Sequence, residues 1–278
     1  MSLLGVVDLF RGRPVHPVGS DGRMALSDHL RELRARILKS ALILLAGFIV
    51  ALFFYNQLFD LVARPYLQAQ ADLGSARTEA VTEGVGAGFL LYFKLSGFAA
   101  LVGTAPLWLY QIWAFIMPGL LPRERRWSAI FVAVAGPLFL VGVAIGYVTL
   151  PTGVRILISF NHAGVKNLVE FNEYLSFFTH TLLMFGVAFE IPVFVVMLNR
   201  VGVLPGRVLP KVRPWVIVGI FVFAAAATPS TDPFTMSMMA IPMCLLYLVA
   251  EMIARVHDRR KKESSAFAGL DPDQPSSL

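Results

Sequence analysis

Charged side chains are scarce in this sequence. Asp, Glu, Lys and Arg make up 15% of its 278 residues, whereas hydrophobic residues make up 56%, and the mean hydropathy is +0.68. A chain with so few charges cannot cover a water-soluble globule with polar surface. The composition therefore excludes the soluble globular class and indicates an integral membrane protein.

The signatures of common enzyme sites are also missing. The sequence has no glycine-rich phosphate loop, no His/Cys cluster with metal-ligand spacing and no nucleophile elbow. Its five histidines are scattered, and its single cysteine, Cys244, excludes an intramolecular disulfide. We therefore expect no enzymatic activity, no metal and no cofactor.

Long apolar runs are what the chain does have. A run of about twenty residues is needed to cross the roughly 30 Å hydrocarbon layer as a helix. Four runs reach that length. Two further runs, 215–227 and 234–250, are shorter, and each is either a short span or part of a re-entrant hairpin. We interpret them as two short spans. The sequence thus predicts an all-α, polytopic protein with six transmembrane helices, at Ile37–Tyr55, Leu95–Met117, Trp127–Leu150, Leu175–Leu198, Trp215–Ala227 and Phe234–Ala250.

The basic residues are distributed unevenly around these runs. Of the 24 Lys and Arg residues, all but five (Arg64, Arg77, Lys94, Arg155 and Lys166) fall on one side of the predicted membrane. Since cytoplasmic loops retain positive charge, both termini are predicted to be cytoplasmic. This topology also explains the net charge of +6, so no nucleic-acid partner is expected. We divide the chain into a cytoplasmic extension (1–23), a membrane domain (24–257) and a disordered cytoplasmic tail (258–278), with some helix in the outer loops 57–93 and 151–172.

Glu32 lies on an amphipathic segment that leads into the first span. Apolar residues recur at helical spacing through Ser27–Lys39, and Arg36 follows Glu32 by one turn. Spacing alone fits a solvated helix face with ordinary ion pairing. The alternative is a binding site, and a second acid at the same predicted membrane depth favours it.

That second acid is Glu124, in the basic turn Pro122–Arg126 between the second and third spans. Helix-favouring residues follow Pro122, so Glu124 is predicted on the first turn of the next helix, where the macrodipole stabilises a carboxylate. An anion at the membrane surface can receive a cationic ligand.

Glu190 is a third notable acid because it falls several turns from either end of the fourth apolar run. A charged carboxyl in hydrocarbon costs about 2.5–3.5 kcal/mol, so such groups face a bundle interior, find a partner or become neutral. Pro192, two residues later, is expected to bend the helix around a cavity. A neutral acid bonded to a neighbouring helix is the structural alternative.

At this point the chain resembles the TatC family, the C subunit of the twin-arginine protein translocase, from about Met24 to His257. The resemblance rests on several motifs in order: Ser27–Arg36, Pro106–Phe115 with Pro118, Glu124–Arg126, Phe185–Pro192 and Thr228–Pro233.

The resemblance implies a six-span concave receptor for signal peptides with paired arginines, which exports folded proteins independently of the Sec pathway using the proton motive force. It assigns the cytoplasmic signal-peptide site to Glu32, Glu124, Arg34, Arg36, Phe115, Arg125 and Arg126. It places Glu190 in the concave cavity as an intramembrane polar site. It assigns partner contacts to Thr228, Asp232 and Thr235, and an outer-cap role to Pro65.

The implied partners are signal peptides of folded cargo proteins, single-span amphipathic subunits of the TatA/TatB type, further copies of the same chain and the lipid bilayer. The implied location is an energy-transducing membrane, the bacterial plasma membrane above all. The sequence departs from the family early in the sixth span, where Thr235 stands in a region that often carries an amide side chain. A different function remains open, that of a proton- or ion-coupled small-molecule transporter using Glu190, but it leaves Glu32 and Glu124 without a role.

Overall fold

The computed structural model describes residues 26–73, 78–116, 125–160, 167–200, 202–227 and 233–267. The predicted extension 1–23 and the tail beyond 267 lie outside these ranges. In chain order the elements are α2 (Leu26–Phe53), α3 (Tyr55–Leu73), β1 (Thr78–Val81), α4 (Ala87–Gly103), α5 (Ala105–Ile116), α6 (Arg125–Ser159), β2 (Asn167–Glu170), α7 (Phe171–Phe189), α8 (Ile191–Arg200), α9 (Leu209–Ala227) and α10 (Pro233–Phe267).

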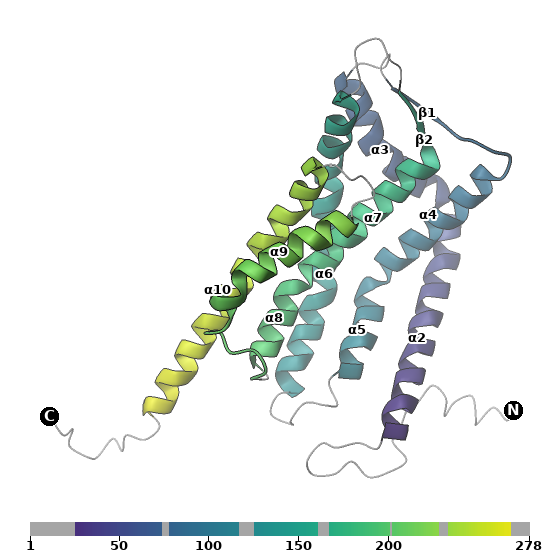
Figure 1. Ribbon diagram of the computed structural model, residues 1–278. Helices are drawn as coiled ribbons and strands as arrows, with labels where there is room; N and C mark the ends of the chain where they lie inside the picture. The colour runs from purple at the N-terminus through teal and green to yellow at the C-terminus, as the bar shows by residue number, and fades with distance from the viewer. Residues whose placement is uncertain are drawn as a thin grey trace, which may run out of the picture.

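The described helices provide six membrane spans. Five helical stretches are long and apolar enough to cross a bilayer, and the bent pair α4–α5 supplies the sixth when it is counted as one span. Figure 1 shows them running between two ends of the molecule. The basic end holds the first turns of α2, the α8–α9 connection (202–208) and the last turns of α10. The cap end holds β1 and β2.

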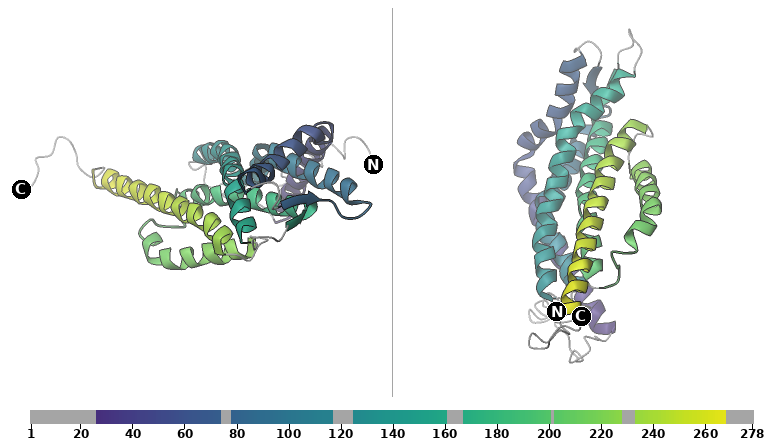
Figure 2. Two further views of the ribbon diagram at one scale, coloured as in Figure 1. Left: turned by 90° about the horizontal axis from the view of Figure 1, so that it is seen from above. Right: turned by 90° about the vertical axis from the view of Figure 1, so that its left-hand side faces the viewer.

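The helices form an open arrangement. Viewed from above, α9 and α10 lie at one end of an elongated row and α2 and α4 at the other, as Figure 2 shows. The predicted all-α fold with a concave bundle is confirmed.

The spans extend beyond the apolar runs that predicted them. α2 already begins at Leu26, and α6 runs from Arg125 to Ser159, because polar turns continue a helix past the hydrocarbon layer. α9, with 19 residues, is short as predicted, since about 1.5 Å per residue just falls short of 30 Å. The sixth helix is not short, contrary to the prediction. α10 has 35 residues, although its apolar part ends near Ala250. The predicted tail from 258 continues this helix as far as Phe267.

Two spans are broken, and a proline follows each break. α4 and α5 meet at Thr104 with a bend of 58°, two residues before Pro106, which has no N–H to donate. The indole Nε1 of Trp108 donates to the Leu101 carbonyl across this bend, at 2.8 Å. The second break separates α7 from α8 at Glu190, two residues before Pro192, where the sequence predicted a bend.

Glycines allow α6 and α7 to pack closely. A Cβ on Gly142 would lie 2.6 Å from the Phe185 carbonyl oxygen, and one on Gly186 would lie 2.6 Å from the Phe139 ring. Membrane helices gain packing energy through such close approaches rather than through a hydrophobic driving force. This contact fixes the middle of the molecule.

Two apolar cores lie on either side of that contact. The first core is formed by all the helices from α3 through α8, around side chains such as Trp113, Phe139 and Phe178. The second core joins the end of α7 to α9 and α10, around Phe185, Met239 and Tyr247. α9 is therefore attached to the rest of the molecule mainly through α10.

The outer loops build a structured cap. β1 and β2 pair in parallel, with Thr78 opposite Asn167, although they are far apart in sequence. Thr78 is buried, with its Oγ1 2.9 Å from the Tyr66 hydroxyl and its carbonyl accepting from Gln70 Nε2 at 2.6 Å. Helix α3 fulfils the expectation of helix in the first outer loop, whereas the strands were not predicted.

Candidate functional site

At the basic end, the first turns of α2 pack against the last turn of α5. The ring of His29 stacks on that of Phe115 with centroids 4.4 Å apart and planes at 19°. Arg36 reaches the same helix, donating to Gln111 Oε1 at 3.2 Å and to the Ala114 carbonyl at 3.5 Å. These contacts place the predicted lead-in segment beside the chain that continues toward Glu124.

Glu32 lies on this packed face of α2 and is largely buried, with 8% of its surface exposed. Its Oε1 accepts a hydrogen bond from Arg36 Nη2 at 3.0 Å. In the described part of the chain no hydrogen bond reaches its Oε2. Arg36 therefore orients the carboxylate through one oxygen and leaves the other for a second donor.

The structure brings together only some of the predicted signal-peptide residues. Glu32, Arg36 and Phe115 converge, whereas Arg34 is exposed on a different side of α2. Arg125 and Arg126 begin α6, and Glu124 lies outside the described residues. Sequence reasoning gave no site role to His29 or Gln111, although His29 precedes Glu32 by three residues and therefore shares its helix face.

Glu190 occupies the break between α7 and α8. It is 7% exposed, and neither carboxylate oxygen has a hydrogen-bond partner in the described chain. A buried carboxyl without a partner is costly in a membrane. The role of Glu190 as an intramembrane polar site that receives a partner from outside the chain stays a prediction.

Of the predicted partner contacts, Thr228 and Asp232 lie outside the described residues. Thr235 is 7% exposed. It lines a small cavity of about 20 Å³ between α6, α7 and α10, together with Thr149 and Thr181. Its side chain thus faces the interior of this chain rather than its outer surface.

Pro65 lies inside α3, where its side chain is fully buried. A proline cannot donate to the carbonyl four residues earlier, which here is that of Leu61. The Tyr147 hydroxyl on α6 donates to this carbonyl at 2.9 Å. Pro65 therefore ties the cap helix to the third span by leaving a carbonyl available.

A cavity of about 610 Å³ opens near the cap, and the sequence did not predict it. Its polar lining includes Lys94, Glu170, Glu173 and Asn172. Asn172 Nδ2 donates to Glu170 Oε1 at 3.1 Å. Lys94 comes from a segment distant in sequence from the other three, so no local motif marks the cavity.

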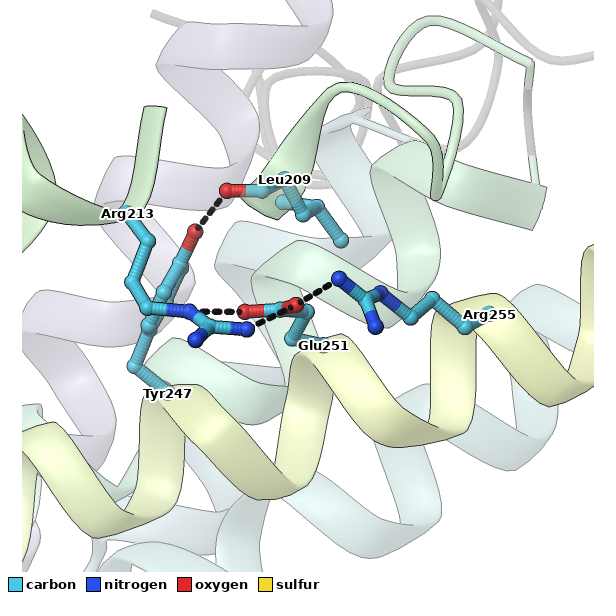
Figure 3. A network of polar contacts seen from close by, with 5 residues as sticks. All are labelled: Leu209, Arg213, Tyr247, Glu251 and Arg255. Atoms are coloured by element: carbon cyan, nitrogen blue, oxygen red, sulfur yellow. Dashed lines mark hydrogen bonds and ion pairs between the residues drawn. The ribbon is translucent and has the colours of Figure 1, made fainter. Parts of the chain in front are cut away.

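A second unpredicted cluster joins α9 and α10. Glu251 is 2% exposed and accepts from Arg213 Nε at 3.0 Å and Nη2 at 2.7 Å. Arg255 Nη2 lies 2.8 Å from its Oε1, as Figure 3 shows. The signal was available in the sequence, because Glu251 directly follows the apolar run that ends at Ala250.

The fold and these sites define a multi-pass α-helical membrane protein with acidic side chains at one membrane surface and within one span. In the described part of the chain no group of His, Cys, Asp and Glu is arranged to hold a metal ion. The class is that of polytopic helical membrane proteins with acidic groups buried in the bundle.

Comparison with known proteins identifies the family. The family model for "Sec-independent protein translocase protein (TatC)" matches residues 28–242. The TatC of Frankia casuarinae is 40% identical over 268 residues, covering 93% of this chain and 74% of that protein. The TatC of Xylanimonas cellulosilytica is 40% identical over 250 residues, covering 90% of each. A crystal structure of a twin arginine translocase receptor, TatC, superposes with a TM-score of 0.71 at 29% identity, covering 82% of this chain and 98% of that one.

The chain belongs to the TatC family of Sec-independent protein translocases. It is a multi-pass protein of the bacterial plasma membrane and a component of protein transport. The small-molecule transporter is therefore disfavoured as an explanation of Glu190.

Proposed function

We propose that this chain is the receptor of a twin-arginine translocase and binds the paired arginines of signal peptides at its cytoplasmic face, through Glu32 and Glu124. The observation that carries the proposal is the state of Glu32. It is a largely buried carboxylate held by Arg36 through one oxygen only. Such a group is oriented before the ligand arrives and retains an acceptor for it.

The chemistry favours arginine over lysine. A guanidinium can donate two parallel hydrogen bonds to one carboxylate, whereas an ammonium is a single point of charge. At the edge of the hydrocarbon layer the lower dielectric strengthens these bonds relative to bulk water. Two acids at one membrane depth would each receive one arginine of the pair.

The stacked rings of His29 and Phe115 support the same role. They hold α2 against α5, and α5 ends just before the segment that contains Glu124. Glu32 therefore lies beside the helix from whose end the chain continues toward Glu124. Arg34, Arg125 and Arg126 would contribute to the charge balance around the bound peptide.

Glu190 supports the second half of the proposal, that the chain recruits single-span partner subunits of the TatA/TatB type. Its two unpaired oxygens suit a polar side chain on an incoming helix. Self-association of the chain belongs to the same proposal. With no nucleotide-binding motif in the sequence, the work of export would come from the proton motive force.

The test is binding of a twin-arginine signal peptide to purified protein in detergent. Glu32→Gln removes the charge but keeps the shape of the side chain, and the expected loss of affinity is at least tenfold, or about 1.4 kcal/mol. Glu124→Gln should act similarly. Asp60→Asn, an exposed acid on α3, is the matched control and should bind as the parent does. Undiminished binding by both Glu variants would refute the receptor assignment.

A further inference from the structure

One stripe of α10 carries the side chains that hold α9 and the α8–α9 connection. Tyr247, Glu251, Ala254 and Asp258 recur every three or four residues and so share one helix face. The Tyr247 hydroxyl donates to the Leu209 carbonyl at 3.1 Å. Figure 3 shows this bond beside the Glu251 pairs.

Further along the stripe, Asp258 holds the connection itself. Its Oδ2 accepts from the Gly206 N–H at 2.6 Å and its Oδ1 from Asn199 Nδ2 at 3.0 Å. Ala254 is fully buried, and a Cβ on Gly206 would lie 3.1 Å from its carbonyl oxygen. The start of α9 is therefore anchored to α10 over several turns.

Glu251 is the central anchor of this stripe. Its side chain is 3% exposed, whereas those of Arg213 and Arg255 are 40% and 41% exposed. Arg213 uses two nitrogens on the two carboxylate oxygens, which fixes both distance and orientation. Rotating or sliding α9 would break the two Arg213 bonds and leave the buried carboxylate with Arg255 as its remaining partner, which is unfavourable.

Beyond these polar contacts near the start of α9, the α9–α10 contact is apolar. It is made by apolar side chains, among them Ile220, Ala224, Met239 and Met243. Apolar contacts depend on area rather than on angle, so they permit several rotations of one helix on another. The outward ridge of α9, with Trp215, Val218 and Val222 at 78%, 56% and 64% exposed, therefore takes its orientation from the polar contacts near the start of the helix.

From this geometry we propose that Glu251 is a positioning residue: through Arg213 it sets the rotation and height of α9 on α10. In doing so it shapes the α9–α10 edge for single-span partner subunits, a role that rests on the proposed function above. In this proposal Glu251 needs no contact with the signal peptide or with the partner. It acts through the helix that it holds.

The positioning is tested by spin-label distances in the otherwise intact protein. Cys244→Ala removes the single native cysteine, and labels are placed at Val218 on α9 and Val249 on α10, both exposed. The parent should give one narrow distance distribution. Glu251→Gln should broaden or shift it, and Glu251→Asp should restore it in part.

Two further variants provide an independent test and a control for this measurement. Arg213→Lys keeps the charge but loses the paired hydrogen bonds, so it should broaden the distribution even if Glu251→Gln folds poorly. Asp72→Asn removes an acid from an exposed ion pair with Arg155, 3.9 Å long, and should leave the distribution unchanged. An unchanged distribution in both Glu251→Gln and Arg213→Lys would overturn the proposal.

A functional measurement separates this inference from the proposed function. In Glu251→Gln, recovery of single-span partners by pull-down should fall at least fivefold, while signal-peptide affinity stays within twofold of the parent. Normal recovery despite a shifted α9 would overturn the partner role of this edge. If the parent itself recovered no partner, the proposed function would fail, and the distance measurement would still decide the role of Glu251.

Discussion

Pro65 and Tyr147 act on the same backbone carbonyl. Pro65 cannot donate to Leu61, and the Tyr147 hydroxyl does so instead, at 2.9 Å. The proline in the cap helix thus makes possible a hydrogen bond to the third span. Any other residue at position 65 would have a backbone N–H that competes with Tyr147 for the Leu61 carbonyl.

This relationship predicts non-additive stabilities. Tyr147→Phe should destabilise the protein by about 1 kcal/mol, since it removes one hydrogen bond from a carbonyl with no local donor. In a Pro65→Ala background the same change should cost clearly less, because the backbone N–H that the substitution introduces can donate to the Leu61 carbonyl. Thermal unfolding of the four proteins in detergent gives the double-mutant cycle. Equal effects in both backgrounds would show that Pro65 and Tyr147 are independent.

A second prediction concerns the α6–α7 contact. Gly142→Ala should lower stability by about 1–3 kcal/mol, because its Cβ would lie 2.6 Å from a backbone oxygen that cannot easily move. Gly153→Ala, on the same helix, is the matched control, since its Cβ would meet only Met238 Sδ at 3.6 Å. Melting temperatures in detergent compare the two. Equal melting temperatures would mean that α6 and α7 can move apart to accommodate the added methyl group without loss of stability.

A third prediction addresses Arg36. Arg36→Lys keeps a positive charge near Glu32 but cannot reproduce the contacts with Gln111 and the Ala114 carbonyl. We expect signal-peptide affinity to fall about tenfold, which is about 1.4 kcal/mol. Arg31→Lys, an exposed arginine on α2, is the control and should change affinity less than twofold. Equal affinities for the two variants would show that Arg36 does not orient Glu32.

A fourth prediction separates Glu190 from the cytoplasmic site. Glu190→Gln removes a carboxyl whose oxygens have no partner in the described chain, so the protein should remain folded and bind signal peptide within twofold of the parent. Partner recovery and export of a reporter protein should both fall at least fivefold. Wild-type export would refute an intramembrane role for Glu190.

Much of the fold was predictable because the membrane imposes one dominant constraint. A run of about twenty apolar residues must form a helix that crosses it, and the described helices lie along the apolar runs, with a break inside the second run and inside the fourth. The ends of the helices were not predictable in this way. Because the last turns of α10 are polar, hydropathy does not indicate that the helix continues into water.

The candidate sites were predictable where one residue is chemically out of place. Glu190 in an apolar run and Glu32 on an amphipathic turn could each be identified locally. The Glu251 anchor needs Arg213 from a different helix, and the cap cavity needs Lys94 beside Glu170. Spacing along one element cannot reveal pairs that only the packing of spans creates.

The parallel pairing of β1 with β2 limits the order in which the molecule can be assembled. The α4–α5 span and α6 lie between the two strands in the chain, and both strands stand at the cap end. Neither strand can find its neighbour until two intervening helices have entered the bilayer and returned the chain to that side. Closure of the cap therefore requires that the second and third spans have already been inserted in the correct orientation.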